Sequence, residues 1–113
     1  MFDRRMMMKM ILAMAICSLV LAVSEYPTIA AEQENGEAGF KENCAECHIG
    51  GGNIVNPNKT LSKMDRNTNG IKTADDIVRV MRKPGEGMTK FDEKTISDID
   101  ARKIAEYIIN TFK

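Results

Sequence analysis

The chain is short and carries no net charge, which limits the classes of protein it can belong to. It has 113 residues, 16 basic and 16 acidic side chains, and no tryptophan, so it holds one domain at most. A neutral chain has no general electrostatic attraction for nucleic acid or anionic lipid, and we expect neither as a partner. A short chain with few large side chains also buries little apolar surface by itself. Domains of this kind usually need a covalent staple or a cofactor.

The first 30 residues have the layout of a secretory signal peptide. Three basic residues lie among the first nine, and Met10 to Val23 is an unbroken run of apolar and small residues. The run is too short for a comfortable transmembrane helix, and Thr28-Ile29-Ala30 is close to the A-x-A cleavage pattern. We therefore expect residues 1–30 to be removed near Ala30, leaving a domain of residues 31–113 in the periplasm. A retained N-terminal anchor is the alternative.

The exported part is expected to begin with a loose polar stretch, a helix and a loop. Glu32 to Glu37 is polar. Phe40 lies four residues after Gly36 and four before the first of two closely spaced cysteines, so these positions share one helical face. We expect a helix from about Gly36 into the cysteines. Ile49 to Asn58 is then predicted to be a loop, because three consecutive glycines and a proline disfavour regular structure.

Three further helices are predicted, and no stretch alternates with the period of a strand. A short helix is expected over Lys59–Asp65. The next begins after Thr73, with Asp76 as its capping-box partner, and ends before Pro84. The last begins after Ser97 and presents an apolar stripe made of Ala101, Ile104, Ala105 and Ile108. The predicted fold class is therefore all-α.

The segment Cys44-Ala45-Glu46-Cys47-His48 carries the chemistry of this chain. Two cysteines three residues apart, followed at once by histidine, are the pattern for covalent attachment of haem. Each thiol adds to one haem vinyl group, and the histidine on the same turn reaches the iron as an axial ligand. We therefore predict one haem c, bound through Cys44 and Cys47. His48 is the only histidine of the chain and stands at the one position that haem attachment demands.

Three other interpretations of the cysteine pair have less support. A thioredoxin-like redox dithiol needs a βαβ context, and no strand is predicted. A structural zinc site needs four ligands, whereas residues 31–113 contain two cysteines and one histidine. A disulfide is sterically allowed and common in exported proteins, but it does not account for the position of His48.

The second axial position of the iron has no histidine to fill it. Met64, Met81, Met88, a lysine or no protein ligand remain as candidates. Met81 lies at a core-facing helical position, whereas Met88 follows Pro-Gly-Glu-Gly in the loop Pro84–Phe91. Glycines there let the backbone approach a flat ligand closely, so we expect Met88 to be the second iron ligand. A methionine ligand raises the haem potential and, by filling the sixth site, disfavours oxygen chemistry.

These residues resemble the small class I cytochromes c, and among them the cytochrome c6 and c553 group. Gly36-x-x-x-Phe40-x-x-x-Cys44-x-x-Cys47-His48 is similar to the N-terminal helix and haem site of that group. Gly87-Met88-Thr89-Lys90-Phe91 is similar to its methionine loop, although Thr89 stands where the family usually has proline. The resemblance covers roughly residues 36–112 and extends to the small monohaem periplasmic cytochromes of metal-respiring bacteria.

The resemblance implies a cytochrome c fold, with three to five helices wrapped around one haem. It also implies that Gly36 and Phe40 cross against Tyr107. Around the haem, Asn53 and Lys59 are candidates for contact with a propionate, or are simply solvated. The Pro57 carbonyl is a candidate acceptor for the ring N–H of His48, or Pro57 only ends a loop.

The expected function is electron transfer by a single haem that cycles between Fe(II) and Fe(III). Its partners would be other redox proteins, and the chain would be a monomer with no enzymatic turnover and no stable insertion in a membrane. The alternative is a haem-based sensor or gas-binding cytochrome with a weak or displaceable sixth ligand. A peroxidase has less support, because the chain has no spare histidine. Basic side chains either surround the haem edge for docking or are only solvated, namely Lys63, Lys72, Arg82, Lys83, Lys90 and Lys94.

Overall fold

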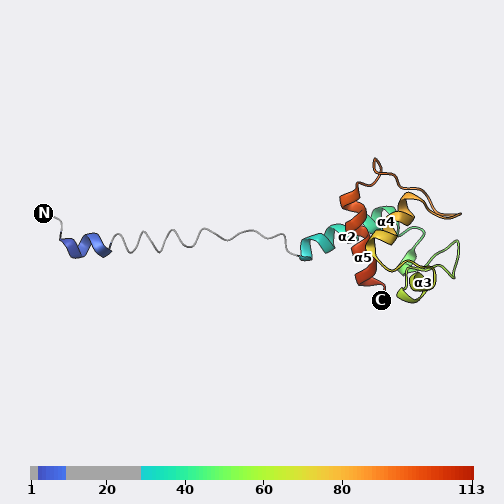
Figure 1. The fold of residues 1–113 in the computed structure, drawn as a ribbon, viewed down its shortest axis with the longest axis horizontal. Coiled ribbons are helices and arrows are strands. Elements are labelled where there is room, and N and C mark those ends of the chain that lie inside the picture. The colour runs from blue at the N-terminus through green and yellow to red at the C-terminus, as the bar shows by residue number, and fades with distance from the viewer. Residues whose placement is uncertain (1–2, 10–28) are drawn as a thin grey trace.

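The computed structural model describes residues 3–9 and 29–113 (Figure 1). The apolar run of the expected leader lies outside these residues, so the signal peptide remains a prediction. A short helical segment covers residues 4–9. Within the described ranges, every helix is too short or too polar to cross a membrane.

Residues 29–113 form helices joined by loops, and no strand occurs in the described residues. The prediction of an all-α fold is therefore confirmed. The elements in chain order are α2 (Ile29–Asn43), the 3₁₀ turn η1 (Ile49–Gly51), α3 (Lys63–Thr68), α4 (Ala74–Arg82) and α5 (Asp98–Thr111).

Helix α2 begins earlier than the sequence pattern indicates. Its first residue is Ile29, so the stretch over residues 32–37 is helical and the prediction of a loose segment there was wrong. Residues 30–34 are Ala-Ala-Glu-Gln-Glu, all with high intrinsic helix propensity. A polar sequence that lacks an apolar stripe can still be helical when its first residues favour the helix, even though Asn35 and Gly36 after them do not.

Helix α3 lies further along the chain than predicted, at residues 63–68 rather than 59–65. Its N-cap is Ser62, whose side-chain oxygen accepts a hydrogen bond of 3.2 Å from the backbone N–H of Asp65. A capping serine satisfies one of the free N–H groups of the first turn and thereby sets the start of the helix. Residues 59–61 precede this cap and are not helical.

Helices α4 and α5 begin at the predicted caps. Thr73 accepts a hydrogen bond of 3.2 Å from the N–H of Asp76, and the Asp76 carboxylate accepts one of 2.9 Å from the N–H of Thr73. This reciprocal pair is the predicted capping box. Ser97 caps α5 by accepting from the N–H of Asp100, and α4 ends at Arg82, before Pro84.

The core lies where α2 and α4 both pack against α5 (Figure 1). The four residues of the predicted α5 stripe are at most 3% exposed. Gly36 of α2 faces the backbone of Lys103, and the rings of Phe40 and Tyr107 lie 5.4 Å apart between centroids. The predicted crossing of α2 against Tyr107 is therefore present, and Phe112 adds a third ring to the cluster.

Candidate haem site

The two thiols of the motif lie on the turn that follows α2. The backbone N–H groups of Cys47 and His48 both donate to the carbonyl of Cys44, over 3.2 and 2.9 Å. This single turn holds the three side chains close together. Both thiols are free, with Cys44 buried and Cys47 exposed. Burial raises the pKa of the Cys44 thiol to about 11.

The imidazole of His48 is held by a backbone carbonyl. Its Nδ1 lies 2.7 Å from the carbonyl oxygen of Gly52. A carbonyl only accepts hydrogen bonds, so Nδ1 carries the proton and Nε2 of the neutral ring keeps its lone pair for a metal. Of the two alternatives for Pro57, the structure contradicts the first, that its carbonyl accepts this bond. The turn η1, closed by the N–H of Gly52 on the carbonyl of Ile49, brings the Gly52 carbonyl back toward the ring.

Asn53 and Lys59 act together in shaping the loop after the motif. The Asn53 side-chain oxygen accepts from the N–H groups of Val55 and Asn56, over 3.0 and 2.9 Å, and its amide donates to the Lys59 carbonyl over 2.9 Å. Both polar atoms of Asn53 are thus used within the loop. The Lys59 side chain is exposed, and its contact with a propionate stays a prediction.

The loop that carries Met88 packs against this loop. Gly87 has a φ of +88°, and a Cβ atom added to it would stand 2.8 Å from Cγ1 of Val55. The left-handed backbone favours glycine here, and the absence of a Cβ atom lets the Val55 side chain come close. The contact brings the half-buried Met88 next to the segment that follows the cysteine motif.

The other two methionines of residues 31–113 have different surroundings. Met81 is 3% exposed and forms part of the core between α4 and α5, as predicted. Met64 is 74% exposed on α3. Neither belongs to the two loops that Gly87 and Val55 bring together.

The surroundings of the motif fit a haem. Three large apolar side chains just after it are strongly exposed, namely Ile49 at 69%, Ile54 at 63% and Val55 at 58%. Large apolar side chains that are exposed this close together in the chain mark a surface that a ligand covers, and a porphyrin attached to the neighbouring thiols would cover them. Among the described residues, no group of three or more His, Cys, Asp or Glu side chains could hold a bare metal ion. One histidine and one methionine suit an iron whose other four ligands come from a porphyrin.

One residue of the expected docking set has a different environment. The Arg82 side chain is 20% exposed and is ion-paired with Asp98, at 2.7 Å between Nη2 and Oδ1. It therefore does not belong to a solvated ring around the haem edge, whereas the five lysines of that set are exposed.

Two other contacts of the site were not predicted from the sequence, namely the bond of His48 to the Gly52 carbonyl and the approach of Gly87 to Val55. No side-chain pattern could have indicated the first, but a glycine directly before a candidate ligand is a signal for the second.

Comparison with known proteins identifies the family. Residues 31–108 match the family described as "Cytochrome C oxidase, cbb3-type, subunit III". Cytochrome c6 of Cyanidium caldarium is 31% identical over 93% of this chain and 94% of the relative. Cytochrome c6 of a Synechococcus strain is 34% identical over 88% of each chain. The chain belongs to the small class I c-type cytochromes.

Solved structures agree with this family. OmcF, an outer membrane cytochrome of Geobacter sulfurreducens, is 45% identical and superposes with a TM-score of 0.68, covering 69% of this cytochrome and 99% of OmcF. Oxidised cytochrome c6A of Arabidopsis thaliana is 29% identical with a TM-score of 0.67, covering 74% and 90%. This class I cytochrome therefore has the all-α cytochrome fold and a covalently bound c-type haem, and it is a monohaem electron-transfer cytochrome.

Proposed function

We propose that this cytochrome shuttles single electrons between redox proteins outside the cytoplasm, with its haem iron ligated by His48 and Met88. The haem supplies a one-electron Fe(III)/Fe(II) couple. The observation that carries the ligand assignment is the contact of Gly87 with Val55, which seats the methionine loop on the loop after the cysteine motif.

The chain's own residues orient both ligands. The Gly52 carbonyl fixes the ring and the tautomer of His48 and leaves Nε2 as the ligating atom. Met88 is placed by the loop that Gly87 anchors. A thioether in the sixth position raises the potential and excludes small ligands, which suits an electron carrier better than oxygen chemistry.

Export is part of this proposal. Residues 1–30 have the layout of a signal peptide, and OmcF is by its name an outer membrane cytochrome. We propose a periplasmic monomer that docks briefly and weakly with its donor and acceptor, as redox partners do. It has no enzymatic turnover of its own. If Ala30 ends the leader, mass spectrometry of the purified holoprotein will find a chain that begins at Ala31.

The ligand assignment is tested by Met88→Ala, with Met64→Ala as its matched control. Ferric haem with sulfur ligation has a weak red absorption band. We expect this band in the wild type and in Met64→Ala, whose side chain is exposed, and its loss in Met88→Ala. A redox titration should show a lower potential for Met88→Ala alone, because methionine ligation raises it.

Two results would contradict this proposal. High-spin ferric haem in the wild type would favour the alternative function, a sensor or gas-binding cytochrome with an open sixth site. A band that Met64→Ala removes and Met88→Ala leaves would reassign the ligand to α3.

A further inference from the structure

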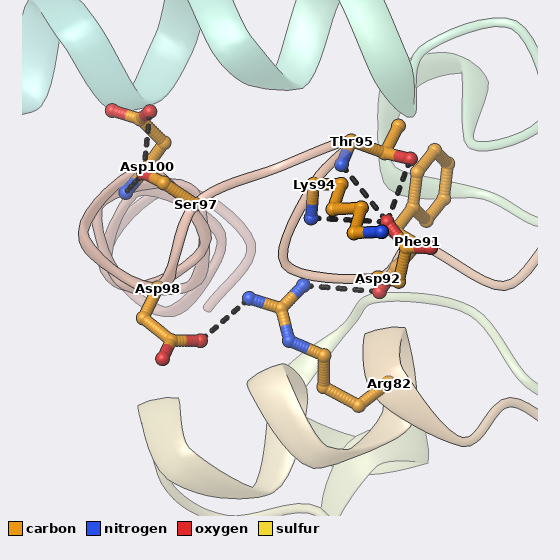
Figure 2. Close-up of polar contacts among 8 residues, drawn as sticks. All are labelled: Arg82, Phe91, Asp92, Lys94, Thr95, Ser97, Asp98 and Asp100. Atoms are coloured by element: carbon orange, nitrogen blue, oxygen red, sulfur yellow. Dashed lines mark hydrogen bonds and ion pairs between the residues drawn. The ribbon is translucent and has the colours of Figure 1, made fainter.

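We propose that Arg82 closes the base of the methionine loop and is the positioning residue for Met88. This role rests on the proposed ligation of the iron by Met88. The loop comprises residues 83–90, between the end of α4 and Phe91. Arg82 is the last residue of α4, so its side chain lies where the loop leaves the helix (Figure 2).

Both backbone groups of Phe91 are bound by the last turn of α4. The N–H of Phe91 donates to the carbonyl of Met81 over 2.9 Å. The carbonyl of Phe91 accepts from Nη1 of Arg82 over 3.0 Å. These two bonds join the end of the loop to its beginning, and Met88 lies only three residues before the closed end.

The same guanidinium also holds α5. Its Nη2 donates to Oδ1 of Asp98, in the first turn of α5, over 2.7 Å. Figure 2 shows Arg82 reaching from α4 between Asp98 and the Phe91 segment. The planar guanidinium of Arg82 thus joins three segments: α4 before the loop, Phe91 after the loop, and α5.

The chain beyond Phe91 is also fixed. One carboxylate oxygen of Asp92 accepts from the N–H of Lys94 and from the N–H and hydroxyl of Thr95, over 2.9 to 3.1 Å. Ile96 then enters the core at 4% exposure. The Phe91 end of the loop is therefore held between a local turn and Arg82.

An unpaired donor supports a positioning role. Nε of Arg82 is buried and has no hydrogen-bond partner among the described residues. Leaving a buried N–H unpaired costs free energy. The guanidinium is planar and its five donors have a fixed geometry. It therefore cannot rotate to give Nε a partner without losing its hydrogen bond to Phe91 or to Asp98. The side chain is therefore committed to these two contacts.

Opening the base of the loop would loosen Met88. Without the Arg82 contact, Phe91 keeps only its N–H bond to the Met81 carbonyl, and a loop whose end is held less firmly has more conformations in which the ligand is absent from the iron. An external ligand binds more tightly when the competing closed state is less populated. The affinity of ferric haem for added imidazole therefore reports how firmly the loop holds Met88.

The experiment compares Arg82→Gln with Arg102→Gln in the holoprotein. Arg102 also joins α4 to α5, through an ion pair with Asp75 at the other end of α4, away from the loop. Each variant removes one interhelical ion pair, so the loss of a link between α4 and α5 is common to both. We expect Arg82→Gln to bind imidazole about tenfold more tightly, the effect of losing a hydrogen bond from a charged donor. Its red sulfur-to-iron band should also be weaker, whereas Arg102→Gln should match the wild type in both readouts.

Further variants separate the contact of Arg82 with Phe91 from its contact with Asp98. Asp98→Asn keeps the bond from Arg82 to the Phe91 carbonyl, so its imidazole affinity should stay closer to the wild type than that of Arg82→Gln. Arg82→Lys serves if Arg82→Gln does not fold. A single ammonium cannot reproduce the geometry of the planar guanidinium, so this variant too should bind imidazole more tightly than the wild type does.

The outcomes distinguish the two proposals. If the wild type has the sulfur band but Arg82→Gln, or Arg82→Lys in its place, binds imidazole like Arg102→Gln, the positioning role of Arg82 is wrong and the ligation by Met88 stands. If the wild type lacks the sulfur band, both the ligation and the role of Arg82 are overturned.

Discussion

Gly36 controls how closely α2 and α5 can cross. A Cβ atom at this position would overlap the carbonyl oxygen of Lys103 and stand 2.9 Å from its carbon and 3.0 Å from Cβ of Tyr107. Two of these atoms belong to the backbone of a helix and cannot move aside as a flexible side chain would. Glycine inside a helix is otherwise unfavourable by about 1 kcal/mol relative to alanine, so propensity and packing oppose each other here.

Gly36→Ala should therefore lower the free energy of unfolding of the holoprotein. Overpacking of a tight contact costs about 1–3 kcal/mol, which outweighs the gain in propensity. Denaturant titration followed by helical circular dichroism measures the change. Glu42→Ala is the control, because this side chain is exposed on the same helix. Its effect should stay within about 0.5 kcal/mol, and a Gly36→Ala protein more stable than the wild type would contradict the steric argument.

Single residues could be predicted from the sequence where the side chain itself performs the chemistry. Cys44, Cys47 and His48 are of this kind, because haem attachment depends on two thiols and an imidazole at fixed spacing. The partner of His48 is not, since it is the backbone carbonyl of Gly52, and any residue type supplies a carbonyl. Asn53 differs again, because its amide holds the loop.

At the scale of elements, the start of α4 depends on one carboxylate. Asp76 accepts from the backbone N–H groups of Lys72 and Thr73, each over 2.9 Å, and from the Arg79 guanidinium over 2.6 Å. These bonds, the backbone donors first, hold the pKa of Asp76 well below its usual range. The ionised capping box therefore stabilises the folded chain.

In the variant Asp76→Asn, the free energy of unfolding should fall less steeply as the pH is lowered than it does in the wild type. A carboxylate whose pKa is lower in the folded state contributes stability above its unfolded pKa, about 3.9, and this contribution is lost as the pH falls below that value. The wild type should therefore exceed Asp76→Asn in stability at neutral pH, and the gap should narrow as the pH drops below about 4. Denaturant midpoints across this range measure the gap. A constant difference at all pH values would show that ionisation of Asp76 plays no part.

Helix boundaries could be predicted only where a cap signal is local. Thr73 and Ser97 placed α4 and α5 correctly, because an oxygen on the side chain satisfies an N–H two or three residues away. Ser62-x-x-Asp65 is a signal of the same kind and would have placed α3. The start of α2 has no such signal, and good helix formers let the helix extend to Ile29.

At the scale of the whole molecule, the protein core is small. The buried apolar residues of the described part number ten, and three of them are alanines. The apolar side chains after the cysteine motif stay exposed, among them Ile54 and Val55. The haem must therefore supply much of the core. It adds the apolar surface that a short chain without tryptophan cannot bury by itself.

Removing the attachment of haem should therefore remove the stable fold. In Cys44→Ala/Cys47→Ala neither thioether can form, and the contacts of α5 with α2 and α4 remain as the main packing. We expect a large loss of helical circular dichroism and no cooperative thermal transition, because a domain of this size needs its staple. Cys47→Ala keeps the buried Cys44 as one attachment point and should fold with intermediate stability. If the double variant kept the helicity and the cooperative transition of the holoprotein, the helices alone would be a sufficient core, and the haem would bind a fold that exists without it.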